Sequence, residues 1–259
     1  MIGKILFIFY VICIGCAVPV SIGVKHAVKN NKLVWADSVN LLLAREIELA
    51  CMMDNCIPIS ESIGSGTSFI IDHVGDRSII MTAAHLCKDP KNYGQSSAGG
   101  LELTNVFEMG VIRGDTFYEF KEILYNNSLN DICIFTTTYI PGKKARIARW
   151  APTYGDKIWS IGAPAGYFPE SAKPIAHGFF SGDAQRVVNP KLMIGFYNFS
   201  MPTIPGMSGS PIYNDSGEVI GIVSAVHYRW HMISYSPTHE QIINAIEVAM
   251  IKLESQDLE

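Results

Sequence analysis

The sequence predicts an all-β domain of two packed six-stranded barrels, and three observations indicate this fold class. Its 22 glycines and 13 prolines separate many short runs of Val, Ile, Phe and Tyr, which is typical of strands joined by turns. These runs fall into two sets, at about residues 61–140 and 154–237, with a basic Pro/Gly link at 141–145 between them. Each set holds about six runs, enough for a small barrel.

The expected strands follow the apolar runs in chain order, each bounded by turn residues. In the first half they are 68–72, 78–82, 101–103, 106–113, 116–125 and 132–137. In the second half they are 157–161, 175–181, 193–199, 210–213, 219–226 and 232–236.

The first thirty residues differ from the rest, and residues 1–30 are predicted to be a signal anchor or a signal peptide. Residues 5–24 carry no formal charge and are flanked by Lys4 and Lys25. A run of this length is sufficient to span a membrane as a helix. It exceeds the apolar core of a typical cleavable signal, which favours a retained anchor. Small residues around Cys16 leave cleavage, and therefore secretion, as the alternative.

Helices are expected at both ends of the β-rich domain, which we place at residues 61–259. Residues 31–60 are interpreted as a helical connector, because apolar residues recur at helical spacing within 35–53. A terminal helix is predicted after Thr238, where Thr238 and Gln241 have the spacing of a capping box.

Composition excludes several classes of partner and cofactor. Charged residues make up 17% of the chain and the net charge is -4, which does not favour a polyanion-binding surface, so no nucleic acid partner is expected. Among the six cysteines, only Cys51 and Cys56 form a close pair in the body, whereas a structural zinc site requires two such pairs. We therefore expect no metal and no cofactor. A Cys51–Cys56 disulfide is left open, and Cys133 is interpreted as a buried apolar residue.

Ser208 is the predicted nucleophile, in the run Gly206-Met207-Ser208-Gly209. A reactive serine requires a tight turn that exposes its hydroxyl and directs backbone N–H groups toward the developing oxyanion. The flanking glycines permit such a turn. Turns in β proteins are themselves rich in Gly and Ser, so the motif alone does not decide the function.

A histidine and an aspartate upstream give the serine its context. His85 ends the run Thr82-Ala83-Ala84-His85 after an apolar strand, and Asp131 precedes another strand. The two lie 46 residues apart in the first half, and Ser208 follows 77 residues later in the second. This arrangement predicts an active site between the two halves.

On these residues the chain resembles the chymotrypsin/trypsin-like serine proteases, which share the order His, Asp, Ser. The resemblance covers about residues 63–243 and is strongest toward the HtrA-like and glutamyl-endopeptidase-like branches. It also includes the runs 64–71 and 217–222. It implies a chymotrypsin-like fold in which His85, Asp131 and Ser208 form a catalytic triad.

Each assignment has a competitor. Asp131 could instead cap the turn before it, and Asp115 or Asp89 could take its role. Ser210 is the competing nucleophile, but no Gly-x pair precedes it. Ser208 is favoured over Ser210 for this reason.

The resemblance implies a serine endopeptidase that acts through an acyl-enzyme, with the N–H groups of Gly206 and Ser208 as the oxyanion hole. A protein or peptide is then the substrate. The implied substrate-binding residues are Thr203, Ile222, Val223, Ser224 and Ala225. We expect a small or medium apolar residue before the scissile bond.

The sequence departs from the family at several positions. Met207 occupies the place of an aspartate that pairs with a new amino terminus in digestive members, so this activation step is not expected. Pro202 stands where trypsin has its pocket aspartate, which argues against a preference for Arg or Lys. Thr203 resembles a pocket threonine of the glutamyl-endopeptidase branch, but that branch's histidine is Val223 here. The family's disulfide beside the histidine does not fit Cys87, which is expected to be a free thiol.

One other function and two locations remain open at this point. The chain could be a catalytically idle trypsin-like fold that serves as a membrane-tethered binding module. The protease domain is expected outside the cytoplasm, either anchored to a membrane through the N-terminal segment or secreted if that segment is cleaved.

Overall fold

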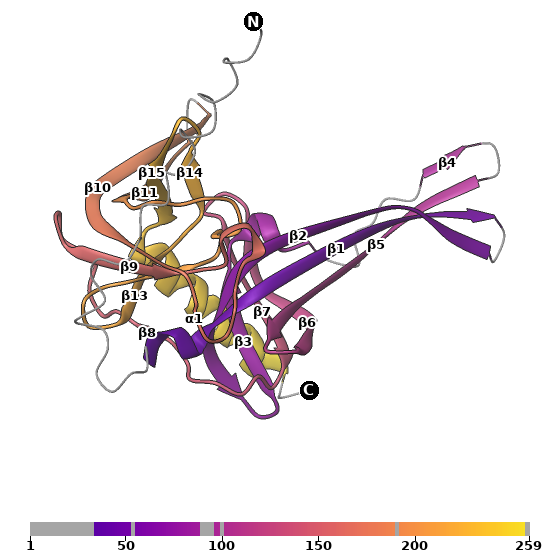
Figure 1. Ribbon diagram of the computed structural model, residues 1–259, viewed down its shortest axis with the longest axis horizontal. Coiled ribbons are helices and arrows are strands. Elements are labelled where there is room, and N and C mark those ends of the chain that lie inside the picture. The colour runs from indigo at the N-terminus through magenta and orange to yellow at the C-terminus, as the bar shows by residue number, and fades with distance from the viewer. Residues whose placement is uncertain (1–33, 53–54, 89–95, 99–100, 190–191, 257–259) are drawn as a thin grey trace, which may run out of the picture. The chain divides into compact units, whose positions relative to one another are not determined.

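The computed structural model describes residues 34–52, 55–88, 96–98, 101–189 and 192–256, and the predicted signal anchor lies outside these residues. Most of the described chain is β-structure, followed by one long helix at the C-terminus (Figure 1). Three short 3-10 helices are η2 (Val34–Ser38), η3 (Ala84–Leu86) and η4 (Pro164–Gly166). The β-rich class that the sequence predicts is thereby confirmed.

The first half is a closed six-stranded barrel. Its strands pair in the order β1-β2-β3-β7-β6-β5, and a further pairing of β5 with β1 closes the ring. The short β4 extends β5 outside this ring. The strands are β1 (Val39–Met52), β2 (Asn55–Val74), β3 (Arg77–Thr82), β4 (Ser96–Ala98), β5 (Leu101–Arg113), β6 (Thr116–Asn127) and β7 (Ile132–Thr138).

The second half differs from the predicted six-stranded barrel. Its eight described strands pair in the order β14-β15-β11-β10-β9-β12-β13-β8, and no pairing among the described residues closes them into a ring. Two strands were not predicted separately. One is β8, which is two residues long, and the other is β14, which the predicted strand 219–226 joined to β13. The strands are β8 (Arg146–Ile147), β9 (Lys157–Ile161), β10 (Ile175–Asn189), β11 (Leu192–Ser200), β12 (Pro211–Tyr213), β13 (Glu218–Ile222), β14 (Ala225–His227) and β15 (Trp230–Pro237).

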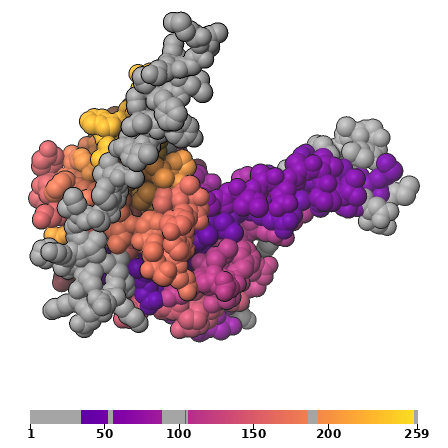
Figure 2. Space-filling view, viewed as in Figure 1, coloured from indigo at the N-terminus to yellow at the C-terminus, as the bar shows by residue number. Residues whose placement is uncertain are grey.

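The predicted helical connector is wrong, because residues 39–52 form β1. Residues 39–52 of this strand pair with β2 on one side, and residues 41–51 pair with β5 on the other. Two full ladders satisfy its backbone, and this pairing overrides a composition rich in Leu, Ala and Glu. The strands continue past the barrel as a ribbon (Figures 1 and 2). We call the part formed by residues 45–52, 55–63 and 101–108 the arm.

The arm is held together by a disulfide and by ion pairs. Cys51 and Cys56 oppose each other on β1 and β2 and form a disulfide, which the sequence left open. Arg45 on the central strand pairs with Glu61 at 2.8 Å and with Glu108 at 3.3 Å. All three strands of the arm are therefore linked by side chains as well as by backbone ladders.

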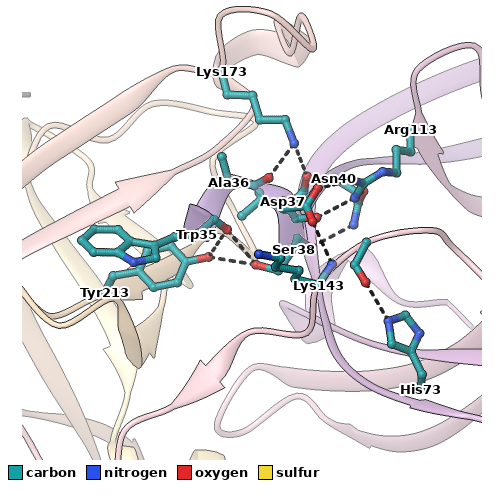
Figure 3. Close-up of polar contacts among 12 residues, drawn as sticks. Trp35, Ala36, Asp37, Ser38, Asn40, His73, Arg113, Lys143, Lys173 and Tyr213 are labelled. Atoms are coloured by element: carbon teal, nitrogen blue, oxygen red, sulfur yellow. Dashed lines mark hydrogen bonds and ion pairs between the residues drawn. The ribbon is translucent and has the colours of Figure 1, made fainter. Parts of the chain in front are cut away.

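A polar network fixes the start of β1 (Figure 3). Arg113, at the end of β5, pairs with Asp37 at 2.5 Å. Lys173, in the second half, donates to the carbonyl oxygens of Ala36 at 2.6 Å and Val39 at 2.8 Å. Burial, followed by the nearby Arg113 cation, lowers the pKa of Lys173 to about 8. Both halves of the domain thus bind the same short segment.

A cavity of about 370 Å³ opens beside this network, with Leu41, Ile112 and Phe168 among its lining residues. Its lining includes none of the predicted catalytic residues. This cavity therefore lies away from the predicted site.

The C-terminal helix α1 (His239–Gln256) confirms the predicted terminal helix and its cap. The backbone N–H of Thr238 donates to the side chain of Gln241 at 2.8 Å, and the N–H of Gln241 donates back to the Thr238 hydroxyl at 3.3 Å. Four residues of one helix face, Ile242, Ala245, Ala249 and Leu253, are almost completely buried. Among the described residues, no helix combines the length and the apolar character that a membrane crossing needs.

Candidate active site

Asp131 holds the ring of His85. His85 lies in η3, immediately after β3, and its Nδ1 is 3.0 Å from each carboxylate oxygen of Asp131. The backbone N–H of His85 also donates to Asp131 Oδ1 at 2.9 Å. Two of the predicted catalytic residues are thus brought together, and His85 remains half-exposed on the surface.

Asp131 is itself fixed by its backbone and by Ser224. It has a φ of 56°, in the left-handed region that Asp tolerates better than most residues, just before β7. Its side chain is only 13% exposed. The hydroxyl of Ser224 donates to Asp131 Oδ2 at 2.5 Å. The carboxylate therefore accepts from a ring, a backbone N–H and a hydroxyl, which leaves it little freedom to turn.

A disulfide between Cys87 and Cys133 corrects the prediction of a free thiol at Cys87. Each cysteine lies two residues after a predicted catalytic residue, Cys87 after His85 and Cys133 after Asp131. Both cysteines are buried, as expected for Cys133. The bond therefore ties the segment that carries the histidine to the strand that follows the aspartate.

The turn that carries Ser208 packs directly against the segment leading to His85. Gly206 and Gly209 have φ values of 93° and 81°, which are open to glycine and strained for other residues. A Cβ added at Gly209 would collide with the Thr67 carbonyl and the Thr82 hydroxyl. Thr82 precedes the histidine segment by two residues. The turn of the predicted nucleophile therefore packs against the strand that leads to His85.

Thr67 on β2, which the sequence did not single out, makes two hydrogen bonds to this turn and a third to Ala163. Its N–H donates to the carbonyl of Ser208 at 2.8 Å, and its hydroxyl donates to the carbonyl of Gly206 at 3.0 Å. The same hydroxyl accepts from the N–H of Ala163 at 2.9 Å. Its position directly after Gly64-Ser65-Gly66 is the sequence signal that could have indicated this role, because glycine is favoured where two backbone segments approach closely.

The two N–H groups of the predicted oxyanion hole, on Gly206 and Ser208, donate to no acceptor in the part of the chain that the structure describes. An unpaired N–H pair on one tight turn can receive a developing negative charge. Within the same residues, no hydrogen bond joins the Ser208 hydroxyl to the ring of His85.

A family model described as a trypsin-like peptidase domain matches residues 64–222. The chain belongs to the trypsin-like peptidase family. The match covers both halves of the domain and contains all three predicted catalytic residues. The resemblance to the chymotrypsin/trypsin-like serine proteases, which was stated from the sequence, is therefore confirmed. A search of curated proteins finds no match.

Solved structures share the trypsin-like fold at low sequence identity. The active form of the Rv3671c protease from M. tuberculosis is 17% identical, with a TM-score of 0.60, and the match covers 86% of each chain. The inactive form of the same protease gives a TM-score of 0.56 and 17% identity, over 85% of this chain and 94% of that chain. The serine endoprotease from Yersinia pestis gives 0.53 and 15%, over 80% of this chain and 62% of that chain.

The predicted substrate-binding residues of this trypsin-like peptidase lie in different environments. Ile222 and Val223 are buried, and Ala225 is exposed at the start of β14. Ser224 is turned toward Asp131. Thr203 is 2% exposed, and its hydroxyl lies 2.6 Å from that of Ser234.

The residues that compete with Asp131 and Ser208 for a place in the triad have different outcomes. Asp115 lies at the β5–β6 turn beside the cavity described above, away from His85. Asp89 lies outside the described residues. Ser210 is fully buried, and its hydroxyl has no hydrogen-bond partner among the residues that the structure describes. Among the described residues, no group of three His, Cys, Asp or Glu side chains is arranged to hold a metal ion.

Proposed function

We propose that the chain is a serine endopeptidase whose triad is His85, Asp131 and Ser208. The observation that carries the proposal is the hydrogen-bonded pair of His85 and Asp131 beside a serine turn whose Gly206 and Ser208 N–H groups are unpaired. Membership of the trypsin-like peptidase family supports a peptide or protein substrate.

In the proposed mechanism, His85 removes the proton of the Ser208 hydroxyl as its oxygen attacks the carbonyl carbon of the scissile peptide bond. Asp131 orients the ring and stabilises its protonated form. The N–H groups of Gly206 and Ser208 donate to the oxyanion. The protonated ring then gives its proton to the leaving amine, and water releases the acyl group by the reverse sequence. This chemistry needs no metal or cofactor.

A fluorophosphonate probe, which modifies activated serines, tests the proposal. We expect labelling of the wild type, no labelling of Ser208→Ala, and labelling of the matched control Ser210→Ala if that variant folds. His85→Ala should abolish labelling as well, because the serine then lacks its base. Labelling that persists in Ser208→Ala would contradict the assignment.

A second function is a catalytically idle binding module, and the missing hydrogen bond between Ser208 and His85 favours it. Such contacts are often long in proteases without substrate, which is why we prefer the enzyme. The idle module predicts that neither the wild type nor the variants react with the probe, although all of them fold.

For specificity we propose a small or medium apolar residue before the scissile bond. The paired hydroxyls of the buried Thr203 and Ser234 support a site without formal charge. Profiling with a peptide library checks this preference, and a dominance of charged residues at that position would contradict it.

We propose an extracytoplasmic location, with the domain anchored through the N-terminal segment or secreted after its removal. The two disulfides, Cys51–Cys56 and Cys87–Cys133, support an oxidising compartment. Amino-terminal sequencing of the mature protein, together with its fractionation between membrane and medium, distinguishes the anchored form from the secreted one.

A further inference from the structure

The cavity of about 370 Å³ lies where the two halves of the domain meet. The first half contributes residues 39–41 of β1 and residues 112–115 at the end of β5. The second half contributes residues 168–170 and Lys173. The volume falls within the range of about 300–1,000 Å³ that is typical of small-molecule sites. A ligand in this cavity would therefore contact both halves at once.

Two partly buried cations line the cavity, and both retain unused N–H groups within the part of the chain that the structure describes (Figure 3). Lys173 donates to two backbone carbonyl oxygens, so one of the three N–H groups of its ammonium is left. Arg113, whose side chain is 20% exposed, makes three hydrogen bonds to Asp37 and Asn40, which leaves two of its five N–H groups. Burial, followed by the charge of Arg113, lowers the pKa of Lys173. A carboxylate bound here would accept from both cations and offset their repulsion.

Two carboxylates line the exposed side of the same cavity. Asp115 and Glu170 are both exposed, and the side chain of neither forms an ion pair or a hydrogen bond with another described residue. Asp115 belongs to the β5–β6 turn. The Glu170 carboxylate lies against the adjacent Gly114, where an added Cβ would come within 3.1 Å of its Oε1. A protonated amine bound at this side would meet two carboxylates that have no partner among the described residues.

Apolar side chains complete the lining. Leu41, Ile112 and Phe168 are partly exposed, so part of their surface is open to water. The Nζ of Lys173 lies 4.8 Å from the centre of the Phe168 ring, so the apolar surface adjoins a cation. Covering this surface with an apolar group is favourable. The cavity thus combines cations, carboxylates and apolar surface, and a ligand that contacts all three needs an acid, an amine and an apolar body.

We propose that this cavity binds a short zwitterionic ligand with an apolar body, in the class of free apolar amino acids and dipeptides. Its carboxylate accepts from Lys173 and Arg113. Its amine donates to Asp115 and Glu170, and its side chains pack on the apolar lining. Because the ligand contacts both halves, its binding stabilises the folded domain. The inference does not depend on the proposed peptidase function, since none of the predicted catalytic residues lines the cavity.

Isothermal titration of the full-length protein with the dipeptide Leu-Leu tests the proposal. We expect a dissociation constant of about 1 mM or lower, and a Tm that rises with ligand concentration. N-acetyl-Leu-Leu lacks the amine and Leu-Leu amide lacks the carboxylate, so each should bind about tenfold more weakly or worse. Absence of binding, or equal binding of all three dipeptides, would overturn the inference. Weakening by only one of the two blocks would indicate a site for simple acids or simple amines, and would overturn it as well.

Variants assign each charge of the dipeptide to its partner. Lys173→Met should weaken Leu-Leu about tenfold and should bind Leu-Leu and its amide equally, because the contact is already lost. Lys252→Met is the matched control, since Lys252 also donates to a backbone carbonyl, that of Ile123 at 2.6 Å, but does not line the cavity. It should keep the wild-type affinity. Asp115→Asn/Glu170→Gln should bind Leu-Leu and its acetylated form equally. Wild-type affinity in Lys173→Met or in the double variant would contradict the proposal, and the blocked dipeptides decide it on the wild type if a variant does not fold.

Prior reaction with the fluorophosphonate probe separates the cavity from the active site. We expect the labelled protein to bind Leu-Leu as tightly as the unlabelled protein does. Loss of binding after labelling would place the dipeptide at Ser208, which would overturn the inference and leave the peptidase intact. Failure of the wild type to react with the probe would refute the proposed function instead, while binding of Leu-Leu with the expected response to both blocks would still support the cavity site.

Discussion

The hydroxyl of Ser224 donates a 2.5 Å hydrogen bond to the carboxylate of Asp131, although the two residues are 93 positions apart in the sequence. Asp131 belongs to the first half of the domain and Ser224 to the second. The same carboxylate contacts the ring of His85. The orientation of the histidine therefore depends on how the two halves are packed.

Ser224→Ala tests this dependence. A hydrogen bond to a charged group contributes about 1.5–3 kcal/mol, so we expect kcat to fall by roughly ten- to a hundredfold with little change in KM. Ser224→Thr keeps a hydroxyl and should restore much of the rate. An equal loss in both variants would indicate a packing defect rather than a positioning role.

Gly206→Ala should inactivate the enzyme, because an added Cβ would collide with the carbonyl of Ala163 behind the turn. Gly155→Ala is the matched control, since Gly155 has a similar φ of 88° but open space around its Cβ. Both variants experience backbone strain of about 1 kcal/mol or more. We expect both to lose stability in urea titrations and only Gly206→Ala to lose fluorophosphonate labelling. Equal labelling of the two variants would contradict this expectation.

Removing the disulfide near the site should affect stability and activity together. In the loop-closure model, a bond between residues 46 apart contributes about 4 kcal/mol, and one between residues 5 apart contributes about 2 kcal/mol. We expect Cys87→Ala/Cys133→Ala to unfold at lower urea concentration and to lose activity on short peptides.

Cys51→Ala/Cys56→Ala is the control for that double variant, because its disulfide lies in the arm. It should lose less stability and keep its activity on short peptides. Loss of activity in this control alone would show that the disulfide near the site does not hold the active geometry.

Lys173 should make stability depend on pH. In the folded protein its pKa is about 8, below the ordinary value of 10.5. Between these values the unfolded chain binds more protons than the folded one, so the free energy of unfolding rises with pH. Relative to Lys173→Met, the wild type should gain roughly 2 kcal/mol between pH 7 and pH 10, measured by urea unfolding. A difference that is independent of pH would contradict the assignment.

The sequence predicted the β-rich class, the terminal helix and the pairing of His85 with Asp131, because each depends on local signals. Thr238 and Gln241 are three positions apart, and the runs before His85 and after Asp131 are short and apolar. Ser208 was predicted in the same way, from its flanking glycines, and its role as nucleophile stays a prediction. The geometry between these segments was not predictable, since it depends on contacts between the two halves.

The errors have a common cause, which is pairing between distant residues. Residues 39–52 have helical spacing, but the ladders with β2 and β5 make them a strand. Cys87 was assigned as a free thiol because its partner, Cys133, lies 46 residues away and differs from the partner that the family resemblance suggests. Thr67 was missed because its bonds to the nucleophile turn cross 139 and 141 positions of sequence.

Met207, next to the proposed nucleophile, is 5% exposed and packs in the core of the second half with Ile158, Phe199 and Met201. Apolar burial of this kind requires neither a new chain terminus nor an ion pair, and it forms together with the rest of the core. We therefore expect the nucleophile turn to be in place as soon as the polypeptide has folded. For such an enzyme, activity begins once synthesis and folding of the chain are complete, and it is limited by which substrates reach the site.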